Sequence, residues 1–221
     1  MKKIFLFDLD GTITDPKIGI TTCVQYSLKF FGIKEENLDK LECFIGPPLY
    51  KSYQEYYGLS EEQSIIAVEK YRERYTDIGI FECSMYDGIS EVLSNIKAQG
   101  GKIGLATSKP EEFAKRLLDH YDISRYFDCI TGSMMDGRRT EKCQVIEEVF
   151  KRMGVVDNKE EVIMIGDRLH DVIGAKTMGI ETIGVKYGYS VGDELNEAGA
   201  EYVVETVEEL RKLTNQLICC Q

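Results

Sequence analysis

The sequence predicts an α/β fold: a parallel sheet covered by helices on both faces, with a helical segment inserted near its start. Two observations predict it. Short apolar runs of strand type alternate with segments of helical periodicity through most of the 221 residues. Residues 15–83 interrupt this alternation, because they contain helical patterns and no clear strand. The expected boundaries are therefore a core of residues 1–14 and 84–221 and a helical insertion of residues 15–83.

Five runs have the length and composition of buried strands. They are Lys3–Phe7, Lys102–Ala106, Asp128–Thr131, Glu161–Ile165 and Glu181–Val185. Apolar residues at helical spacing lie between these runs, for example at Ile89, Val92, Leu93 and Ile96, and again at Val145, Ile146, Val149 and Phe150. Strands that alternate with helices are typical of a parallel sheet, because parallel neighbours need long crossover connections.

Three helices are expected in the insertion, over Ile18–Phe31, Leu49–Tyr57 and Glu61–Ile80, with a turn at residues 46–48 before the second. Six tyrosines lie at helical spacing here: Tyr50, Tyr53, Tyr56, Tyr57, Tyr71 and Tyr75. Tyrosines in this pattern are typical of core packing, and stacking on a nucleobase is the alternative. The cations Lys51, Arg72 and Arg74 either face solvent or meet a second anionic group.

Composition restricts the classes of partner. The net charge of −11, from 27 basic and 38 acidic residues, disfavours a nucleic-acid partner, which requires a basic face. No apolar stretch approaches the roughly 20 residues of a membrane helix, and the N-terminal apolar run is too short for a secretory signal. The seven cysteines form no CxxC pair and indicate reduced, mostly buried thiols. We therefore expect a cytoplasmic protein, monomeric or homodimeric.

Polar residues gather where the predicted strands end, which is where ligands bind in an open parallel sheet. They are Asp8, Asp10, Gly11 and Thr12 after the first strand, Thr107, Ser108 and Lys109 after the second, Lys142 at the start of the helix after the third, and Gly166, Asp167, Arg168 and Asp171 after the fourth. The expected site thus contains carboxylates, hydroxyls and lysine, brought together from distant parts of the chain.

These residue types suit phosphoryl transfer. Asp8 and Asp10 are two residues apart, so in a strand they lie on one side and repel unless a cation intervenes. With Asp167 they form an oxygen-only set, which suits Mg²⁺. One carboxylate can be the nucleophile and the other the general acid and base. Thr107 and Lys142 can hold phosphoryl oxygens, and Gly11 permits a close backbone approach.

Four segments in this order resemble the four motifs of the haloacid dehalogenase-like superfamily. Asp8–Thr12 (DLDGT) is similar to the first motif, Ile103–Lys109 (IGLATSK) to the second, Lys142 to the third and Gly166–Asp171 (GDRLHD) to the fourth. The resemblance extends from about residue 3 to about residue 210. The DxDGT segment alone is moderately specific, whereas four ordered motifs, each after a predicted strand, are strongly so.

The resemblance implies a Rossmann-like core with an α-helical cap, residues 15–83, that closes over the site. It implies a magnesium-dependent phosphatase. In such an enzyme Asp8 would be the nucleophile that forms an aspartyl-phosphate, and Asp10 would be the general acid and base. The implied metal ligands are Asp8, the Asp10 carbonyl and Asp167, with Asp171 in support. The implied contacts to the phosphate are Thr107 and Lys142, and we expect Gly11, Thr12 and Ser108 to bind it as well.

Within the superfamily the chain is similar to the phosphoglycolate phosphatase-like branch and its 5′-nucleotidase-like subgroup, through Gly46–Leu49, Arg138-Arg139 and Gly174-Ala175. One position departs from the pattern of many relatives. Lys142 is followed by Cys143 where they have proline, so Arg138 and Arg139 also compete for the third motif. Lys142 is preferred because it begins the helix that carries Val145.

The expected substrate is a small phosphate ester, with nucleoside monophosphates and phosphoglycolate as candidates. A phosphomutase of the same superfamily is the alternative activity, although nothing in the insertion indicates protection of an aspartyl-phosphate from water. A non-catalytic regulatory relative is the alternative of another class, because a fold alone does not establish activity. If these residues have only structural roles, Asp8 and Asp10 cap a loop and Lys142 is a solvated surface lysine.

Overall fold

The computed structural model describes residues 1–155 and 158–219. The chain divides into two compact units. The core unit contains Met1–Thr14 and Met85–Gln221, and the helical unit is Asp15–Ser84. Each unit is built around its own apolar interior, so each is described by itself.

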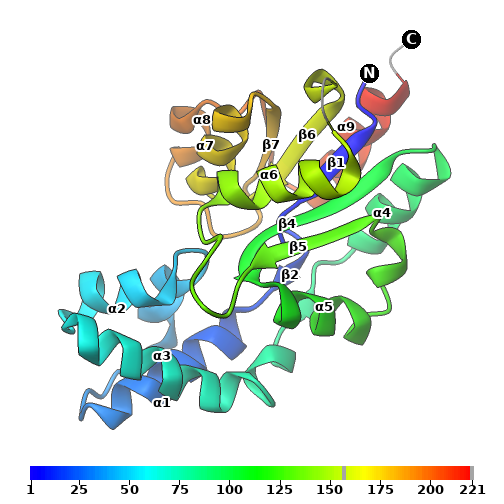
Figure 1. Ribbon diagram of the computed structural model, residues 1–221. Helices are drawn as coiled ribbons and strands as arrows, with labels where there is room; N and C mark the ends of the chain where they lie inside the picture. The colour runs from blue at the N-terminus through cyan, green and yellow to red at the C-terminus, as the bar shows by residue number, and fades with distance from the viewer. Residues whose placement is uncertain (156–157, 220–221) are drawn as a thin grey trace. The chain divides into compact units, whose positions relative to one another are not determined.

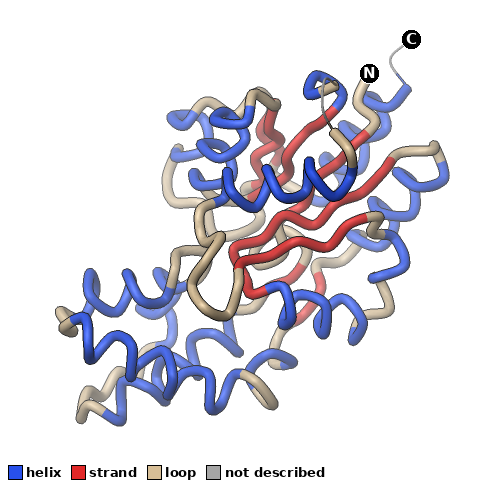
Figure 2. The backbone as a smooth tube through the Cα atoms, in the orientation of Figure 1, coloured by secondary structure: helices blue, strands red, loops and turns tan. Residues whose placement is uncertain are grey.

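The core unit contains a six-stranded parallel sheet (Figures 1 and 2). Its strands are β1 (Ile4–Phe7), β4 (Lys102–Pro110), β5 (Cys129–Ser133), β6 (Val162–Gly166), β7 (Glu181–Val185) and β8 (Tyr202–Val204), in the spatial order β5-β4-β1-β6-β7-β8. Central strand β1 pairs in register with both neighbours, Phe7 lying opposite Leu105 on one side and Ile165 on the other. Its four residues are all buried, which explains the continuous apolar run.

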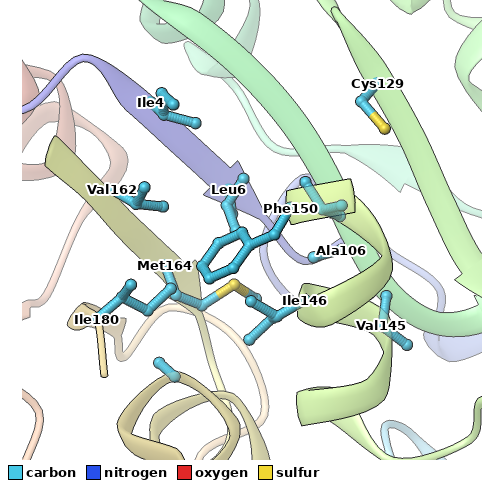
Figure 3. Close-up of a cluster of buried hydrophobic side chains, with 12 residues drawn as sticks. Ile4, Leu6, Ala106, Cys129, Val145, Ile146, Phe150, Val162, Met164 and Ile180 are labelled. Carbon is cyan, nitrogen blue, oxygen red and sulfur yellow. The ribbon is translucent and has the colours of Figure 1, made fainter. Parts of the chain in front are cut away.

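Helices cover the sheet. They are α4 (Ile89–Ala98), α5 (Glu111–His120), α6 (Lys142–Met153), α7 (Leu169–Met178), α8 (Glu194–Ala198) and α9 (Val207–Cys219), with 3₁₀ turns at Ser124–Tyr126 and Lys159–Glu161. Helices α6 and α7 pack against each other on one face, and α4 and α9 pair on the other (Figure 1). Figure 3 shows the interior under α6 and α7, where Phe150 and Ile146 meet Leu6 and Met164.

The helical unit contains α1 (Lys17–Phe30), α2 (Leu49–Tyr57) and α3 (Glu61–Tyr75), with 3₁₀ helices at Leu38–Phe44 and Gly79–Phe81. Its interior is aromatic: the Phe44 and Tyr53 rings meet edge to face with centroids 4.9 Å apart. Tyr53, Tyr71 and Tyr75 are buried, as expected for packing, whereas Tyr56 is exposed. The short strands β2 (Thr14–Asp15) and β3 (Ser84–Met85) pair where the chain enters and leaves this unit.

The predicted fold class is confirmed, but β4 and α3 end several residues away from their predicted ends and an edge strand was missed. Strand β4 continues to Pro110, so the second motif lies within a strand rather than after it, because pairing with β5 resumes at Pro110 and Ser133 beyond a register shift. Helix α3 ends at Tyr75 rather than at Ile80, because the chain turns to bring Gly79 against Cys23 of α1. Strand β8 at the edge of the sheet was not predicted.

Two further expectations concern membranes and thiols. Among the described residues, no helix has the length and apolar character needed to cross a membrane. Five cysteines are free thiols, of which Cys23 and Cys129 are buried and three are half-buried, so burial is less general than predicted. Cys220 and the side chain of Cys219 lie outside the described residues.

Candidate active site

The candidate site lies at the carboxyl ends of the central strands. Strand β1 has β4 on one side and β6 on the other, and the chain proceeds from these two neighbours to opposite edges of the sheet. Such a reversal of strand order opens a crevice at the strand ends, where ligands bind. Asp8 is the first residue beyond β1, and its backbone N–H donates to the Ile165 carbonyl of β6 at 2.9 Å. The topology therefore places Asp8 beside the loop that follows β6.

Three carboxylates converge there. Asp8, Asp167 and Asp171 each offer a carboxylate oxygen, and the three oxygens lie within 4.8 Å of one another. All three residues are buried, with exposed fractions of 7%, 0% and 1% respectively. Lys142 completes the cluster: its Nζ lies 3.0 Å from Asp8 Oδ1 and 2.8 Å from Asp171 Oδ1. It also donates to the Ala106 carbonyl of β4 at 2.9 Å.

One ammonium does not neutralise three buried carboxylates. Burial raises the pKa of Asp167 well above its usual range, and the nearby charges of Asp171 and Asp8 raise it further. Burial likewise raises the pKa of Asp171 to about 6, against the opposing effect of Lys142. Burial alone would lower the pKa of Lys142, but the charges of Asp171 and Asp8 outweigh it and raise that pKa above its usual range. The cluster therefore retains a deficit of positive charge.

The cluster has the properties of a divalent-cation site. Asp8 Oδ1 and Asp171 Oδ1 are buried, and among the described residues both face the same partner, the ammonium of Lys142. Buried carboxylate oxygens normally have partners, so these two oxygens have capacity for a cation beyond the ion pair with Lys142. The donor set consists of oxygens alone, which suits Mg²⁺. The residues present therefore fit the predicted metal.

Asp10 belongs to a second, separate ion pair. Its two carboxylate oxygens lie 2.8 and 2.5 Å from the Nζ of Lys109. The side chains of Lys109 and Asp10 are only 4% and 13% exposed. The site thus has two lysine–carboxylate groupings, one around Lys142 and one formed by Lys109 with Asp10.

Gly11 and Thr12 support the acidic cluster. Gly11 has a φ of 86°, and a Cβ there would lie 2.1 Å from Asp167 Oδ2, so both conformation and space require glycine. Its N–H donates to the Thr14 carbonyl at 2.7 Å. The Thr12 hydroxyl is fully buried and donates to Asp167 Oδ1 at 3.3 Å. In this structure the polar atoms named here make contacts within the chain, with Thr14 and Asp167.

Thr107 and Ser108 are held within β4. Thr107 is buried, and its Oγ1 accepts a hydrogen bond from the Lys109 N–H at 3.2 Å. The Ser108 carbonyl accepts one from the Ser133 hydroxyl at 2.7 Å. Thr107 directly follows Ala106, whose carbonyl binds Lys142. The backbone of β4 therefore joins the predicted hydroxyl donors to the lysine of the acidic cluster.

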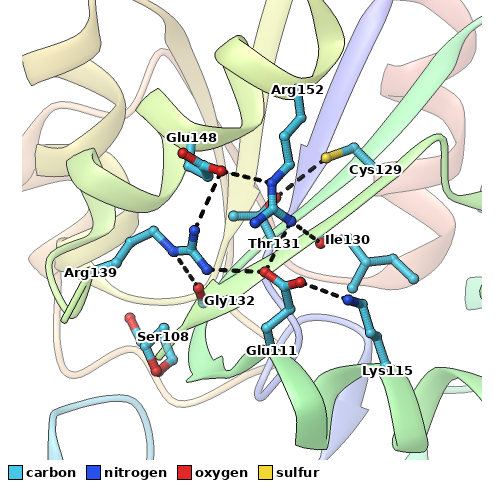
Figure 4. Close-up of polar contacts among 11 residues, drawn as sticks. Ser108, Glu111, Lys115, Cys129, Ile130, Thr131, Gly132, Arg139, Glu148 and Arg152 are labelled. Atoms are coloured by element: carbon cyan, nitrogen blue, oxygen red, sulfur yellow. Dashed lines mark hydrogen bonds and ion pairs between the residues drawn. The ribbon is translucent and has the colours of Figure 1, made fainter. Parts of the chain in front are cut away.

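Arg138, Arg139 and Lys142 are the three candidates for the third motif, and Lys142 contacts the carboxylates. Arg138 is exposed and pairs with Asp136. Arg139 donates to the Gly132 carbonyl and to Glu111 in a polar network that also contains Glu148 and Arg152 (Figure 4). Arg152 bridges Glu148 and Glu111, and Lys115 pairs with Glu111 from the same helix (Figure 4). This network, residues Glu111, Lys115, Arg139, Glu148 and Arg152, ties α5 to α6.

The loop after β7 supplies contacts that the sequence analysis missed. The Tyr189 N–H donates to Asp167 Oδ2 at 2.7 Å, and the Tyr187 hydroxyl donates to the Thr12 carbonyl at 2.9 Å. Between them, a Cβ on Gly188 would lie 2.2 Å from the Gly11 carbonyl oxygen. The signal that could have found this loop is its position directly after the predicted strand Glu181–Val185, at the same edge of the sheet as the other site residues.

Comparison with known proteins gives a family match over most of the chain. The model of the haloacid dehalogenase-like hydrolase family matches residues 5–185. A 5′-nucleotidase from Pseudomonas aeruginosa is 44% identical over 190 residues, covering 86% of this chain and 85% of that protein. The tyrosine-protein kinase PtkA from Mycobacterium tuberculosis is 33% identical over 213 residues, covering 95% of this chain and 72% of that protein.

A solved structure shows the same fold throughout. The crystal structure of a protein from Clostridium acetobutylicum, described as a predicted phosphatase, superposes with a TM-score of 0.93 at 43% identity. The match covers 98% of this chain and 99% of that one. The similarity therefore includes both units and every strand that carries a candidate site residue.

Proposed function

The chain belongs to the haloacid dehalogenase-like hydrolase family and is a phosphatase, and we propose that it hydrolyses small phosphomonoesters with Mg²⁺ through an aspartyl-phosphate on Asp8. The observation that carries the proposal is the buried cluster of Asp8, Asp167 and Asp171 around Lys142. It combines a nucleophile, a cation site and a fixed positive charge at the end of the central strand.

In the first half of the proposed reaction an Asp8 carboxylate oxygen attacks phosphorus. The bond from phosphorus to the ester oxygen breaks, and Asp10 gives that oxygen a proton. Lys142 and the hydroxyls of Thr107 and Ser108 hold the phosphoryl oxygens, where charge is spread in the transition state. We assign Gly11 and Thr12 a supporting role, because their polar atoms contact Thr14 and Asp167.

In the second half a water molecule attacks the phosphorus of the aspartyl-phosphate. Asp10, now a carboxylate, takes the proton from this water, and the bond between phosphorus and Asp8 breaks. Inorganic phosphate leaves, and both aspartates return to their starting forms. Asp8, Asp167 and the Asp10 carbonyl would hold Mg²⁺, with Asp171 in support. When bound, the ion offsets the carboxylate charge and polarises the phosphoryl group.

The substrate we propose is a phosphate ester of metabolite size, with nucleoside 5′-monophosphates first among the candidates. The support is the name of the relative from Pseudomonas aeruginosa, a 5′-nucleotidase 44% identical to this chain. Phosphoglycolate is the second candidate, from the resemblance of the motifs.

The test is phosphate release from a panel of esters, measured with Mg²⁺ and with a chelator. The panel contains nucleoside 5′-monophosphates, phosphoglycolate, sugar phosphates and pyrophosphate. We expect Mg²⁺-dependent release with one class of ester clearly preferred. Asp8→Asn should lower kcat by about 10⁴-fold or more while leaving the circular dichroism spectrum unchanged. Undiminished release by Asp8→Asn would rule out Asp8 as the nucleophile.

Transfer of the phosphoryl group to an acceptor other than water is the alternative activity. A phosphomutase returns the group to its own substrate, and the similarity to PtkA raises the case of a protein acceptor. Both would use the same Asp8 and differ only in the second half of the reaction. Isomer formation without phosphate release would establish the former, and labelling of a tyrosine-containing protein from γ-labelled ATP the latter.

A further inference from the structure

Lys109 is a buried cation that the reaction described above does not use. Its side chain is 4% exposed, which is unusual for lysine. Its Nζ contacts both oxygens of Asp10, at 2.8 and 2.5 Å. Burial of an ammonium is costly unless it is paired, so the partner determines where this side chain lies. That partner is the proposed general acid and base.

Backbone contacts fix the origin of the Lys109 side chain. Lys109 lies near the end of β4, where its N–H donates to Thr107 Oγ1 at 3.2 Å. The neighbouring Ser108 carbonyl is bound by Ser133 of β5 at 2.7 Å. A lysine with a fixed backbone and a buried ion pair has few accessible rotamers. Asp10 lies beyond the end of β1, where its backbone forms a bridge with Thr14, and Lys109 supplies the anchor for its carboxylate.

The pairing is separate from the acidic cluster. Lys142 lies at Asp8 and Asp171, and the three oxygens that lie together there belong to Asp8, Asp167 and Asp171. The two lysines thus serve different carboxylates. Loss of Lys109 would leave the contacts of the Asp8 cluster in place and release only Asp10.

Resting on the proposed function, we infer that Lys109 is a positioning residue that holds the Asp10 carboxyl group in place for both of its proton transfers. When Asp10 gives its proton to the leaving oxygen, negative charge develops on its carboxylate, and the adjacent ammonium stabilises that charge in the transition state. When Asp10 accepts a proton from water, the same contact keeps the carboxylate oriented.

The inference predicts an unequal effect on two classes of ester. An alkyl phosphate has a poor leaving group and needs the proton from Asp10, whereas p-nitrophenyl phosphate has a good leaving group and does not. The parameter kcat/KM reports steps up to departure of the leaving group, so for the aryl ester it is independent of Asp10. We expect Lys109→Met to lower kcat/KM for glycerol phosphate about 100-fold and for p-nitrophenyl phosphate less than about 5-fold.

The second half of the reaction gives another readout. With p-nitrophenyl phosphate, Lys109→Met should release a burst of nitrophenol followed by a slow steady rate, because the aspartyl-phosphate forms normally and hydrolyses slowly. The matched control is Lys151→Met, the same substitution at a lysine that is 63% exposed on α6. It should behave as the wild type with both esters.

Asp10→Asn provides the background that tests the mechanism of the effect. If Lys109 acts through Asp10, adding Lys109→Met to Asp10→Asn should change kcat/KM for glycerol phosphate by less than about 3-fold. Equal losses on both esters, or a full additional loss in the Asp10→Asn background, would overturn the inference. Absence of phosphate release by the wild type from either ester would instead refute the proposed function, so the two failures are distinguishable.

Discussion

At the scale of single residues, the site depends on an imbalance of charge that the fold maintains. Asp8, Asp167 and Asp171 are buried together, and the one ammonium among them belongs to Lys142. Such an arrangement is unfavourable in the metal-free protein, because buried carboxylates repel and lack water. It becomes favourable when a divalent cation binds. If Mg²⁺ binds as proposed, the free energy that the fold loses in the acidic cluster is recovered on binding.

The raised pKa values of this cluster predict a pH-dependent affinity for Mg²⁺. Burial raises the pKa of Asp171 to about 6, against the opposing charge of Lys142, and burial with the charges of Asp171 and Asp8 raises the pKa of Asp167. Both must be ionised to bind the metal, so the affinity should rise as pH increases through about 6, with protons released on binding. Calorimetry in buffers of different ionisation enthalpy measures both quantities. An affinity independent of pH below neutrality would contradict the prediction.

The same raised pKa values predict how pH changes the stability of the metal-free protein. Between the ordinary aspartate pKa and about 6, the folded protein binds more protons than the unfolded chain. The contribution of these groups to the free energy of unfolding therefore decreases as pH rises across that interval. Thermal unfolding in chelator should show this loss, and saturating Mg²⁺ should reverse it.

Site residues that directly follow a strand or begin a helix could be predicted from the sequence alone. Asp8 and Asp167 were predicted because each follows an apolar run, and Lys142 because it begins a helix. Lys109 belongs to the second motif, but the sequence assigns it no role, because its contact with Asp10 depends on the path of β4 beyond Ala106. Side-chain pairing between residues 99 positions apart has no signal in a single sequence.

At the scale of elements, the loop after β7 is a second layer behind the acidic cluster. Tyr187 and Tyr189 bind Thr12 and Asp167, so the loop fixes the residues that follow both β1 and β6. Gly188 permits the approach, because any side chain there would collide with the Gly11 carbonyl. The carboxylate of Asp167 thereby keeps its orientation toward Asp8 and Asp171.

Gly188→Ala should therefore weaken metal binding. The added Cβ would lie 2.2 Å from the Gly11 carbonyl oxygen and 2.5 Å from Asp167 Cβ, so the loop must move and the Tyr189 hydrogen bond must lengthen. Loss of such supporting contacts lowers metal affinity by about 10- to 100-fold. Calorimetric titration with Mg²⁺ measures the change. Val191→Ala, at a position 67% exposed nearby, is the control and should bind as the wild type; equal affinities for all three proteins would refute the role of the loop.

The network between α5 and α6 predicts an effect on stability. Burial alone would raise the pKa of Glu111, but Lys115 and Arg152 outweigh it and hold the pKa below its usual range. The stability gained from Glu111 is therefore present above its unfolded-state pKa and is lost as pH falls. Arg139→Met removes contacts to Glu111 and Gly132 and should lower the free energy of unfolding by about 1–3 kcal/mol.

Urea unfolding of Arg139→Met at neutral and acidic pH checks this expectation. The difference from the wild type should shrink as pH falls and Glu111 becomes protonated. Arg138→Met is the matched control, because Arg138 is exposed and its side chain pairs locally with Asp136, two residues earlier. A loss as large for Arg138→Met as for Arg139→Met would show that the network contributes nothing specific.

Element boundaries were less accessible to prediction than element types. The strands at the centre of the sheet were predicted because both of their faces are buried, as in the run Val162–Ile165. Strand β8 was missed because it has only three residues, of which two are partly exposed, and no long apolar run. The end of α3 depends on the contact of Gly79 with α1, which is tertiary and leaves helical periodicity intact up to Ile80.

At the scale of the whole molecule, the helical unit is an insertion whose ends lie together. It leaves the core after Thr14 and returns at Met85, and the short strands β2 and β3 at these points pair with each other. Paired strands are about 5 Å apart, so a short linker can replace the entire unit without displacing β1 or α4. From the resemblance of the motifs we propose that this unit is a cap that excludes water, and we propose further that it selects the leaving group.

Deletion of residues 15–84, with Thr14 joined to Met85 by a short Gly-Ser linker, tests that role. The site residues all belong to the core unit, so the shortened protein should bind Mg²⁺ and hydrolyse p-nitrophenyl phosphate. Without a cap to exclude water and orient the ester, kcat/KM for the best substrate should fall by about 100-fold or more, and the preference among esters should disappear.

Circular dichroism and a Mg²⁺-dependent rise in Tm first establish that the shortened chain folds. Asp8→Asn in the same shortened chain is the control that assigns residual hydrolysis to the site. If the preference among esters survived the deletion, selection would reside in the core, because the remaining chain contains every side chain of the acidic cluster and of the Lys109–Asp10 pair but none of α1, α2 or α3.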